Sequence, residues 1–200
     1  MKKQLRAVGD FWREEYGRFV GMTAAAFLVL LVLAYVAGRL FPDISAAVIG
    51  AFNEDVASSG IVQADGSFDA LALFANNLRA MVLCVLYGFI PFLYLPALAL
   101  GVNAALLGML ASLMDGRWLL LMAGILPHGI FELPALFLSL AAGLCLCKNI
   151  NAYIRKNEKG VMKPLLLNIL RIAVLLVLPL LALAAAAETY VTPAVMQLFL

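Results

Sequence analysis

The chain has 200 residues, of which 65% are hydrophobic and 13% are charged, and its formal net charge is +2. Soluble domains average roughly 45–50% apolar and about 25% charged residues, so this composition excludes an ordinary soluble domain and indicates an integral membrane protein. The small net charge, with no basic face interleaved with aromatic residues, excludes a nucleic-acid-binding protein. The three cysteines lie in or beside apolar runs, and their odd number predicts buried thiols rather than a disulfide framework.

Residues 1–19 predict an amphipathic helix on the cytoplasmic face of the membrane. Apolar and aromatic residues recur there at steps of three or four from Leu5 to Phe19, and basic residues lie among them. Such a helix suits an anionic inner leaflet, and a charged flank that only sets the topology is an equally open interpretation. We assign residues 20–200 to a single transmembrane domain. Its first span is predicted over 20–40, about the 20 residues that cross hydrocarbon.

Residues 41–69 predict an outer polar loop with a short interfacial helix over 44–52. This loop has five acidic residues and no Lys or Arg. Five basic residues precede the first span, and five more occupy a second loop over 148–163, namely Lys148, Arg155, Lys156, Lys159 and Lys163. Cytoplasmic loops collect Lys and Arg, so the N-terminus and the second loop are predicted inside and the acidic loop outside.

Three spans fit between these two loops. Residues 71–114 are too long for one helix across roughly 30 Å of hydrocarbon at about 1.5 Å per residue. They predict helices over 72–94 and 97–113, with a turn marked by Pro91 and Pro96 and an end at Asp115-Gly116. The last span is predicted over 165–187, and the tail after Pro193 is predicted either in the outer interface or folded back against the bundle. The fold class is therefore an all-α, polytopic transmembrane bundle of about five spans, with the N-terminus inside and the C-terminus outside.

The fourth span, residues 117–147, is longer than the membrane requires. As one helix it would extend about 46 Å, against roughly 30 Å of hydrocarbon. Pro127, Gly129 and Pro134 predict an interruption, which is either a kink in a continuous helix or a true break that lines a cavity. Broken helices of the second kind form the midplane sites of many transporters.

The predicted interruption carries His128, which is the one histidine of the chain, and Glu132. Ionisable groups at membrane depth are costly and usually face a protein interior or a water-filled cavity, and residues four apart share a helix face. A buried pair that fixes helix packing is one interpretation, and a proton relay or ligand-binding site is another. We predict no metal site, because zinc usually takes three or four protein ligands and the chain has a single histidine.

Further polar residues of the spans extend this candidate site. Asn76, Asn77 and Asn103 are suited to hydrogen bonds between helices, and Arg79 lies near the predicted outer end of the second span. Glu188, at the predicted outer end of the last span, is either solvated or in contact with the bundle or a partner. No nucleophile elbow, pair of carboxylates on the membrane face or nucleotide loop is recognisable, so the sequence predicts no enzyme and no cofactor.

Motifs along nearly the whole chain resemble the stage II sporulation protein M family. The most specific is Pro127-His128-Gly129 followed by Glu132, and one departure is Ala104, where the family often has glycine. The other motifs are 74–79 (FANNLR), 87–91 (YGFIP), Asn103 with 107–108 (LG), 141–144 (AAGL) and 187–193 (AETYVTP).

The resemblance implies a membrane component that works with peptidoglycan-degrading partners, in spore formers during engulfment. We therefore expect a scaffold or anchor for envelope-remodelling proteins in a bacterial-type cytoplasmic membrane. The expected partners are the lipid bilayer and those remodelling proteins, with a homodimer as an open alternative. The competing class is a small transporter or channel with a midplane polar site around His128 and Glu132.

Overall fold

The computed structural model describes residues 2–63, 67–156, 160 and 162–199; Lys159 of the predicted inner loop lies outside them. Within these ranges the chain forms helices and no strand, apart from one isolated β-bridge between Val62 and Phe68. Five helical segments among the described residues are long and apolar enough to cross a membrane. The predicted all-α bundle of five spans is confirmed.

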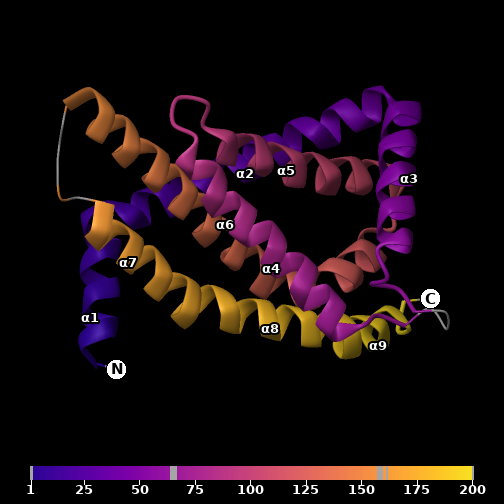
Figure 1. Ribbon diagram of the computed structural model, residues 1–200. Helices are drawn as coiled ribbons and strands as arrows, with labels where there is room; N and C mark the ends of the chain where they lie inside the picture. The colour runs from indigo at the N-terminus through magenta and orange to yellow at the C-terminus, as the bar shows by residue number, and fades with distance from the viewer. Residues whose placement is uncertain (1, 64–66, 157–159, 161, 200) are drawn as a thin grey trace.

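The first span and the amphipathic helix predicted over residues 1–19 form one continuous helical segment. α1 (Lys2–Phe11) passes through a short π-helix, η1 (Trp12–Tyr16), into α2 (Gly17–Leu40). Figure 1 shows that the chain changes direction between α1 and α2. The side chain of Tyr16 is fully buried, and its hydroxyl donates a hydrogen bond of 2.5 Å to the carbonyl oxygen of Leu138. The N-terminal segment is therefore anchored on the bundle.

Most of the predicted outer loop is helical. α3 (Pro42–Ser58) is longer than the helix predicted over 44–52, and Pro42 lies in its first turn. α4 (Ala70–Leu86) begins after Asp69, whose carboxylate accepts hydrogen bonds from the backbone N–H groups of Leu71 and Ala72. In Figure 1, α1 and α3 lie at opposite ends of the bundle.

The turn predicted between Pro91 and Pro96 is present. α4 ends in a 3-10 turn, η2 (Tyr87–Phe89), and α5 (Leu95–Leu113) starts with Pro96 in its first turn. Proline suits this position because the first N–H groups of a helix have no partner within the helix. The turn after α5 contains Asp115 and Gly116, with positive φ angles of 30° and 80°, at the place that the sequence predicts.

The fourth span, α6 (Trp118–Lys156), is one helix of 39 residues and the most buried of the five. Pro127 and Pro134 both lie inside it, and Gly129 is also helical. The prediction of a true break is therefore wrong. The structure has the other alternative, a continuous helix. At about 1.5 Å per residue α6 extends about 58 Å. It continues to Lys156, and so into residues 148–163, which the sequence predicts as a loop.

The last span contains two π-helices, and each stands just before a proline. α7 (Met162–Ile172) leads through η3 (Ala173–Val177) into α8 (Leu178–Ala186), and η4 (Ala187–Val191) leads into α9 (Thr192–Met196). Pro179 and Pro193 cannot donate a backbone hydrogen bond, and we attribute the local widening of the helix to this loss. The helix continues past Pro193 to Met196 and packs against α6, which corrects the interfacial position and leaves the alternative of contact with the bundle.

Glycines allow close approach between the spans. A Cβ atom on Gly88 would lie 2.9 Å from the Cα atom of Gly143, and one on Gly108 would lie 2.8 Å from Cβ of Ala34. Small residues at helix contacts are typical of membrane proteins, where packing rather than hydrophobic transfer drives association. Three of the motif positions of the sequence are therefore contact points of the fold.

Ion pairs join the helices at both ends of the bundle. Arg39, near the end of α2, lies 2.6 Å from the carboxylate of Asp115. At the other end Lys148 of α6 pairs with Glu15. Each pair joins residues that the topology predicts on one side of the membrane. The assignment of those sides as inside and outside stays a prediction.

Candidate functional site

The bundle contains a cavity of about 640 Å³ between α3, α4, α6 and the last span. Most of its lining is apolar, with side chains such as Phe52, Leu73 and Ile125. The polar residues of its wall are Asn53, Asn76, Asn77, His128, Glu132 and Glu188. Five of these six are candidate site residues of the sequence, so the fold gathers them around one space.

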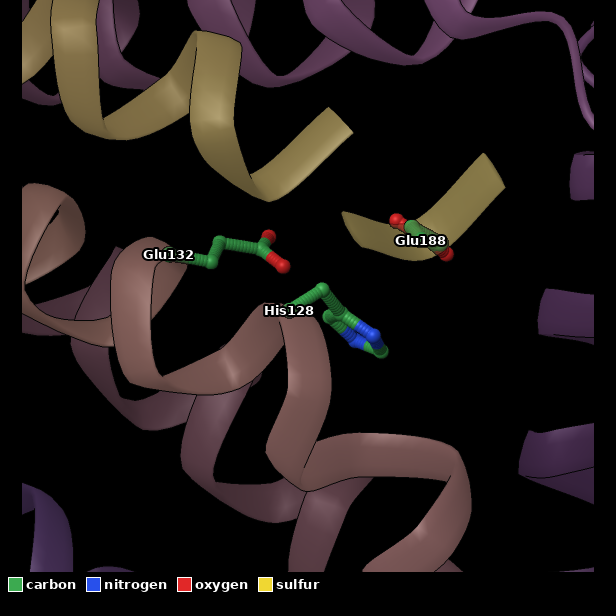
Figure 2. Close-up of side chains that lie close together, drawn as sticks. All are labelled: His128, Glu132 and Glu188. Atoms are coloured by element: carbon green, nitrogen blue, oxygen red, sulfur yellow. The ribbon is translucent and has the colours of Figure 1, made fainter. Parts of the chain in front are cut away.

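Three ionisable side chains meet at the wall of this cavity. His128 and Glu132 stand one turn apart on α6, and Glu188 belongs to the π-helix η4 of the last span. One ring nitrogen of His128 and one carboxylate oxygen from each glutamate all lie within 4.8 Å of one another. Figure 2 shows the two side chains of α6 reaching toward the segment that carries Glu188. All three side chains are partly buried.

The three groups meet because the last span continues past Glu188. His128 lies ten residues from the start of α6 at Trp118, about 15 Å along the helix. Glu188 lies eight residues from the end of α9 at Met196, about 12 Å along that helix. These depths differ by less than one helical turn. The sequence prediction placed Glu188 at the end of the span and so separated it from His128.

A hydrogen bond from the last span orients the imidazole of His128. Nδ1 lies 3.3 Å from Oγ1 of Thr192, and Oγ1 donates its own proton to the carbonyl oxygen of Ala187 at 3.2 Å. A hydroxyl has one proton to donate, so Oγ1 accepts from Nδ1–H. The lone pair of the neutral imidazole is then on Nε2. Thr192 is buried, and its position was not predicted from the sequence.

The carboxylates of Glu132 and Glu188 have no comparable hydrogen bond among the described residues. Among the described residues neither Glu132 nor Glu188 forms a hydrogen bond or an ion pair. Two charged carboxylates at this separation repel strongly in apolar surroundings, and a cation or a proton between them would remove that repulsion. The arrangement is therefore suited to binding a positively charged species.

The remaining candidate residues have different positions. Asn76 and Asn77 line the same cavity from α4. Asn103 lines a smaller cavity of about 160 Å³ that also borders His128 and Glu132, and its side-chain amide donates to the carbonyl oxygen of Ala99. Arg79 is exposed on α4 and belongs to none of these walls. The structure thus separates Arg79 from the polar site in which the sequence analysis grouped it.

The five apolar helical segments define a multi-pass membrane protein. The profile of the stage II sporulation protein M family matches residues 19–193, so the chain belongs to this family. It is also similar to an uncharacterized protein of Methanocaldococcus jannaschii, with 28% identity over 170 residues, which covers 83% of this chain and 93% of that protein. Among solved structures none matches the chain. The resemblance seen in the motifs is confirmed.

Proposed function

We propose that this protein is a small transporter that binds a cation within the membrane. The observation that carries the proposal is the cavity of about 640 Å³ with His128, Glu132 and Glu188 on its wall. Binding pockets for small molecules occupy roughly 300–1,000 Å³ and combine an apolar lining with a few convergent polar groups. This cavity meets both criteria.

The position of the three ionisable groups inside transmembrane segments also supports a binding site. Ionisable groups in transmembrane segments usually mark an ion or solute pathway, because lipid does not compensate their charge. The last span has a π-helix at the site, and π-helical turns are frequent at functional positions. The proposed role is binding and translocation, and we propose no catalytic step and no cofactor.

Flux into liposomes tests the transporter function. Purified protein is reconstituted into liposomes that hold fluorescent reporters for protons, monovalent cations and divalent cations. We expect one of these fluxes to exceed that of protein-free liposomes and to fall at least tenfold in Glu132→Gln. Glu54→Gln, which changes an exposed carboxylate of α3, is the matched control and should keep the flux. Wild-type protein that moves none of the three would overturn the proposal.

A second candidate function is a scaffold for envelope-remodelling proteins in a bacterial-type cytoplasmic membrane. Membership of the stage II sporulation protein M family supports it, and so does Arg79. This arginine lies about midway along the 20-residue span Ala70–Phe89, is exposed, and forms no hydrogen bond or ion pair with the described residues. An exposed charge at this depth is costly in lipid, so a partner chain that contacts α4 would stabilise it. That partner is a remodelling protein or a second copy of this chain.

Co-purification from native membranes distinguishes these partners. The scaffold function predicts that peptidoglycan-remodelling proteins co-purify with the wild type and are lost from Arg79→Ala. Leu71→Ala, which changes another exposed side chain of α4, is the control and should retain them. A wild type that purifies only as a homodimer would contradict the scaffold function.

A further inference from the structure

We propose that His128, Glu132 and Glu188 bind one divalent transition-metal ion, of the class of Zn²⁺ or Mn²⁺. The inference rests on the proposed solute-binding function and names the class of its solute. The ligands are Nε2 of the imidazole and one or two oxygens from each carboxylate. The single histidine led to the prediction of no metal site. The sequence alone does not place Glu188 beside His128 and Glu132.

The charges of the cluster balance when such an ion is bound. A neutral imidazole and two carboxylates carry a total charge of −2, and a divalent cation brings the site to zero. Charge neutrality matters here because an isolated charge is costly inside a bundle surrounded by lipid. No lysine or arginine lies on the wall of either cavity at the site, and among the described residues neither carboxylate has an ion pair. The bundle itself therefore provides no counter-charge for the two glutamates.

The geometry requires only a small movement of the side chains. With metal–ligand bonds of about 2.0–2.2 Å, ligand atoms in a tetrahedral site lie about 3.4 Å apart. One ring nitrogen of His128 and one oxygen from each carboxylate lie within 4.8 Å of one another, so rotation about the flexible side chains brings three donor atoms to bonding distance. The adjoining cavity of about 640 Å³ has room for a water molecule as the fourth ligand.

Thr192 supplies an independent observation that points to a metal ligand. Its hydroxyl accepts a hydrogen bond from Nδ1–H of His128 and donates one to the carbonyl oxygen of Ala187. Histidines that bind metals usually donate the second ring nitrogen in this way, which fixes the ring and leaves the other lone pair for the ion.

The ligand set also indicates which cations fit. Ca²⁺ takes six to eight oxygen ligands, and Mg²⁺ keeps several of its waters and prefers oxygen donors. A mixed set of one imidazole and two carboxylates is more typical of Zn²⁺, Mn²⁺ and Fe²⁺. We expect the site to prefer ions of this group to Ca²⁺ and Mg²⁺ at equal concentration.

Equilibrium dialysis with Zn²⁺ or Mn²⁺ tests the site on the full-length protein in detergent micelles. The affinity tag must contain no histidine, because added imidazoles would bind the metal themselves. We expect one ion per wild-type chain and at least a tenfold loss of affinity in Glu188→Gln and in His128→Gln. Glu54→Gln is the control and should bind like the wild type. A monodisperse elution profile for each variant shows that it is folded.

The outcomes separate this inference from the transporter function. Wild-type protein that binds neither ion, or Glu188→Gln and His128→Gln variants that bind as tightly as the control, would overturn the metal site. A flux of protons or monovalent cations without metal binding would also overturn it and would leave the transporter function standing. Metal binding at these residues without any flux would support the site and overturn transport.

Discussion

Oγ1 of Thr192 in the last span lies 3.3 Å from Nδ1 of His128 in the fourth span. The contact connects the helix that carries the histidine to the first residue of α9, which directly follows the π-helix that carries Glu188. It therefore couples the orientation of the imidazole to the local shape of the last span, and it can be removed by one substitution.

Replacing Thr192 by valine removes this hydrogen bond with little change in side-chain size. We expect the affinity for Zn²⁺ to fall about 10–100-fold, because partners that orient a ligand typically contribute that much. The matched control is Thr189→Val in the adjoining π-helix η4, since the hydroxyl of Thr189 is buried and has no hydrogen-bond partner among the described residues. Equal affinities of the two variants in equilibrium dialysis would show that Thr192 does not orient the ring.

The contact between α4 and α6 predicts a strong effect of one methyl group. A Cβ atom on Gly143 would lie 2.9 Å from Cγ of Pro96 and closer still to the carbonyl oxygen of Cys84. We expect Gly143→Ala to destabilise the protein by about 1–3 kcal/mol, because overpacking forces the helices apart. Gly101→Ala is the control, since a Cβ atom there meets nothing within 4 Å. Thermal unfolding in detergent measures the effect: the Tm of Gly143→Ala should fall below that of the wild type, and the Tm of Gly101→Ala should not.

The buried hydroxyl of Tyr16 gives a prediction for the N-terminal segment. Tyr16→Phe loses the hydrogen bond to Leu138 and should cost about 0.5–1.5 kcal/mol of stability. Tyr190 is 72% exposed, so Tyr190→Phe should leave the Tm unchanged. If both variants unfold at the wild-type temperature, the hydrogen bond contributes nothing to the anchoring of this segment.

The orientation in the membrane predicts opposite labelling of two exposed positions. Ser59 directly follows α3 on the predicted outer side, and Lys163 lies near the start of α7 on the predicted inner side. An impermeant maleimide should modify Ser59→Cys in intact cells and Lys163→Cys only after permeabilisation. The native thiols are all buried, so their background should be low. The reverse pattern would show that the charge-based topology is inverted.

The number and order of the spans could be predicted because they depend on the lengths of apolar runs. Pro91, Pro96, Asp115 and Gly116 interrupt those runs, and the structure has turns at the expected places. The helix α3 was underestimated, since polar and acidic residues in 41–58 match no simple pattern of burial. The sequence also did not decide whether α6 is continuous. A proline in a helix removes one hydrogen bond, but this loss occurs both in a kink and in a break.

The candidate site could be predicted only where its residues are neighbours in the sequence. His128 and Glu132 share a helix face, so their spacing was sufficient. Glu188 and Thr192 join them through tertiary packing and through a helix that continues past Pro193. Thr192 and Pro193 are adjacent in the sequence, but their spacing does not show that Thr192 contacts α6.

The most direct test is anomalous X-ray diffraction from crystals of the Zn²⁺-loaded protein, measured above and below the zinc absorption edge. We predict one anomalous peak per chain, about 2.0–2.2 Å from Nε2 of His128 and from an oxygen of both Glu132 and Glu188. The absence of such a peak, or a single peak bound elsewhere on the protein, would contradict the proposal that these three residues form an intramembrane cation site.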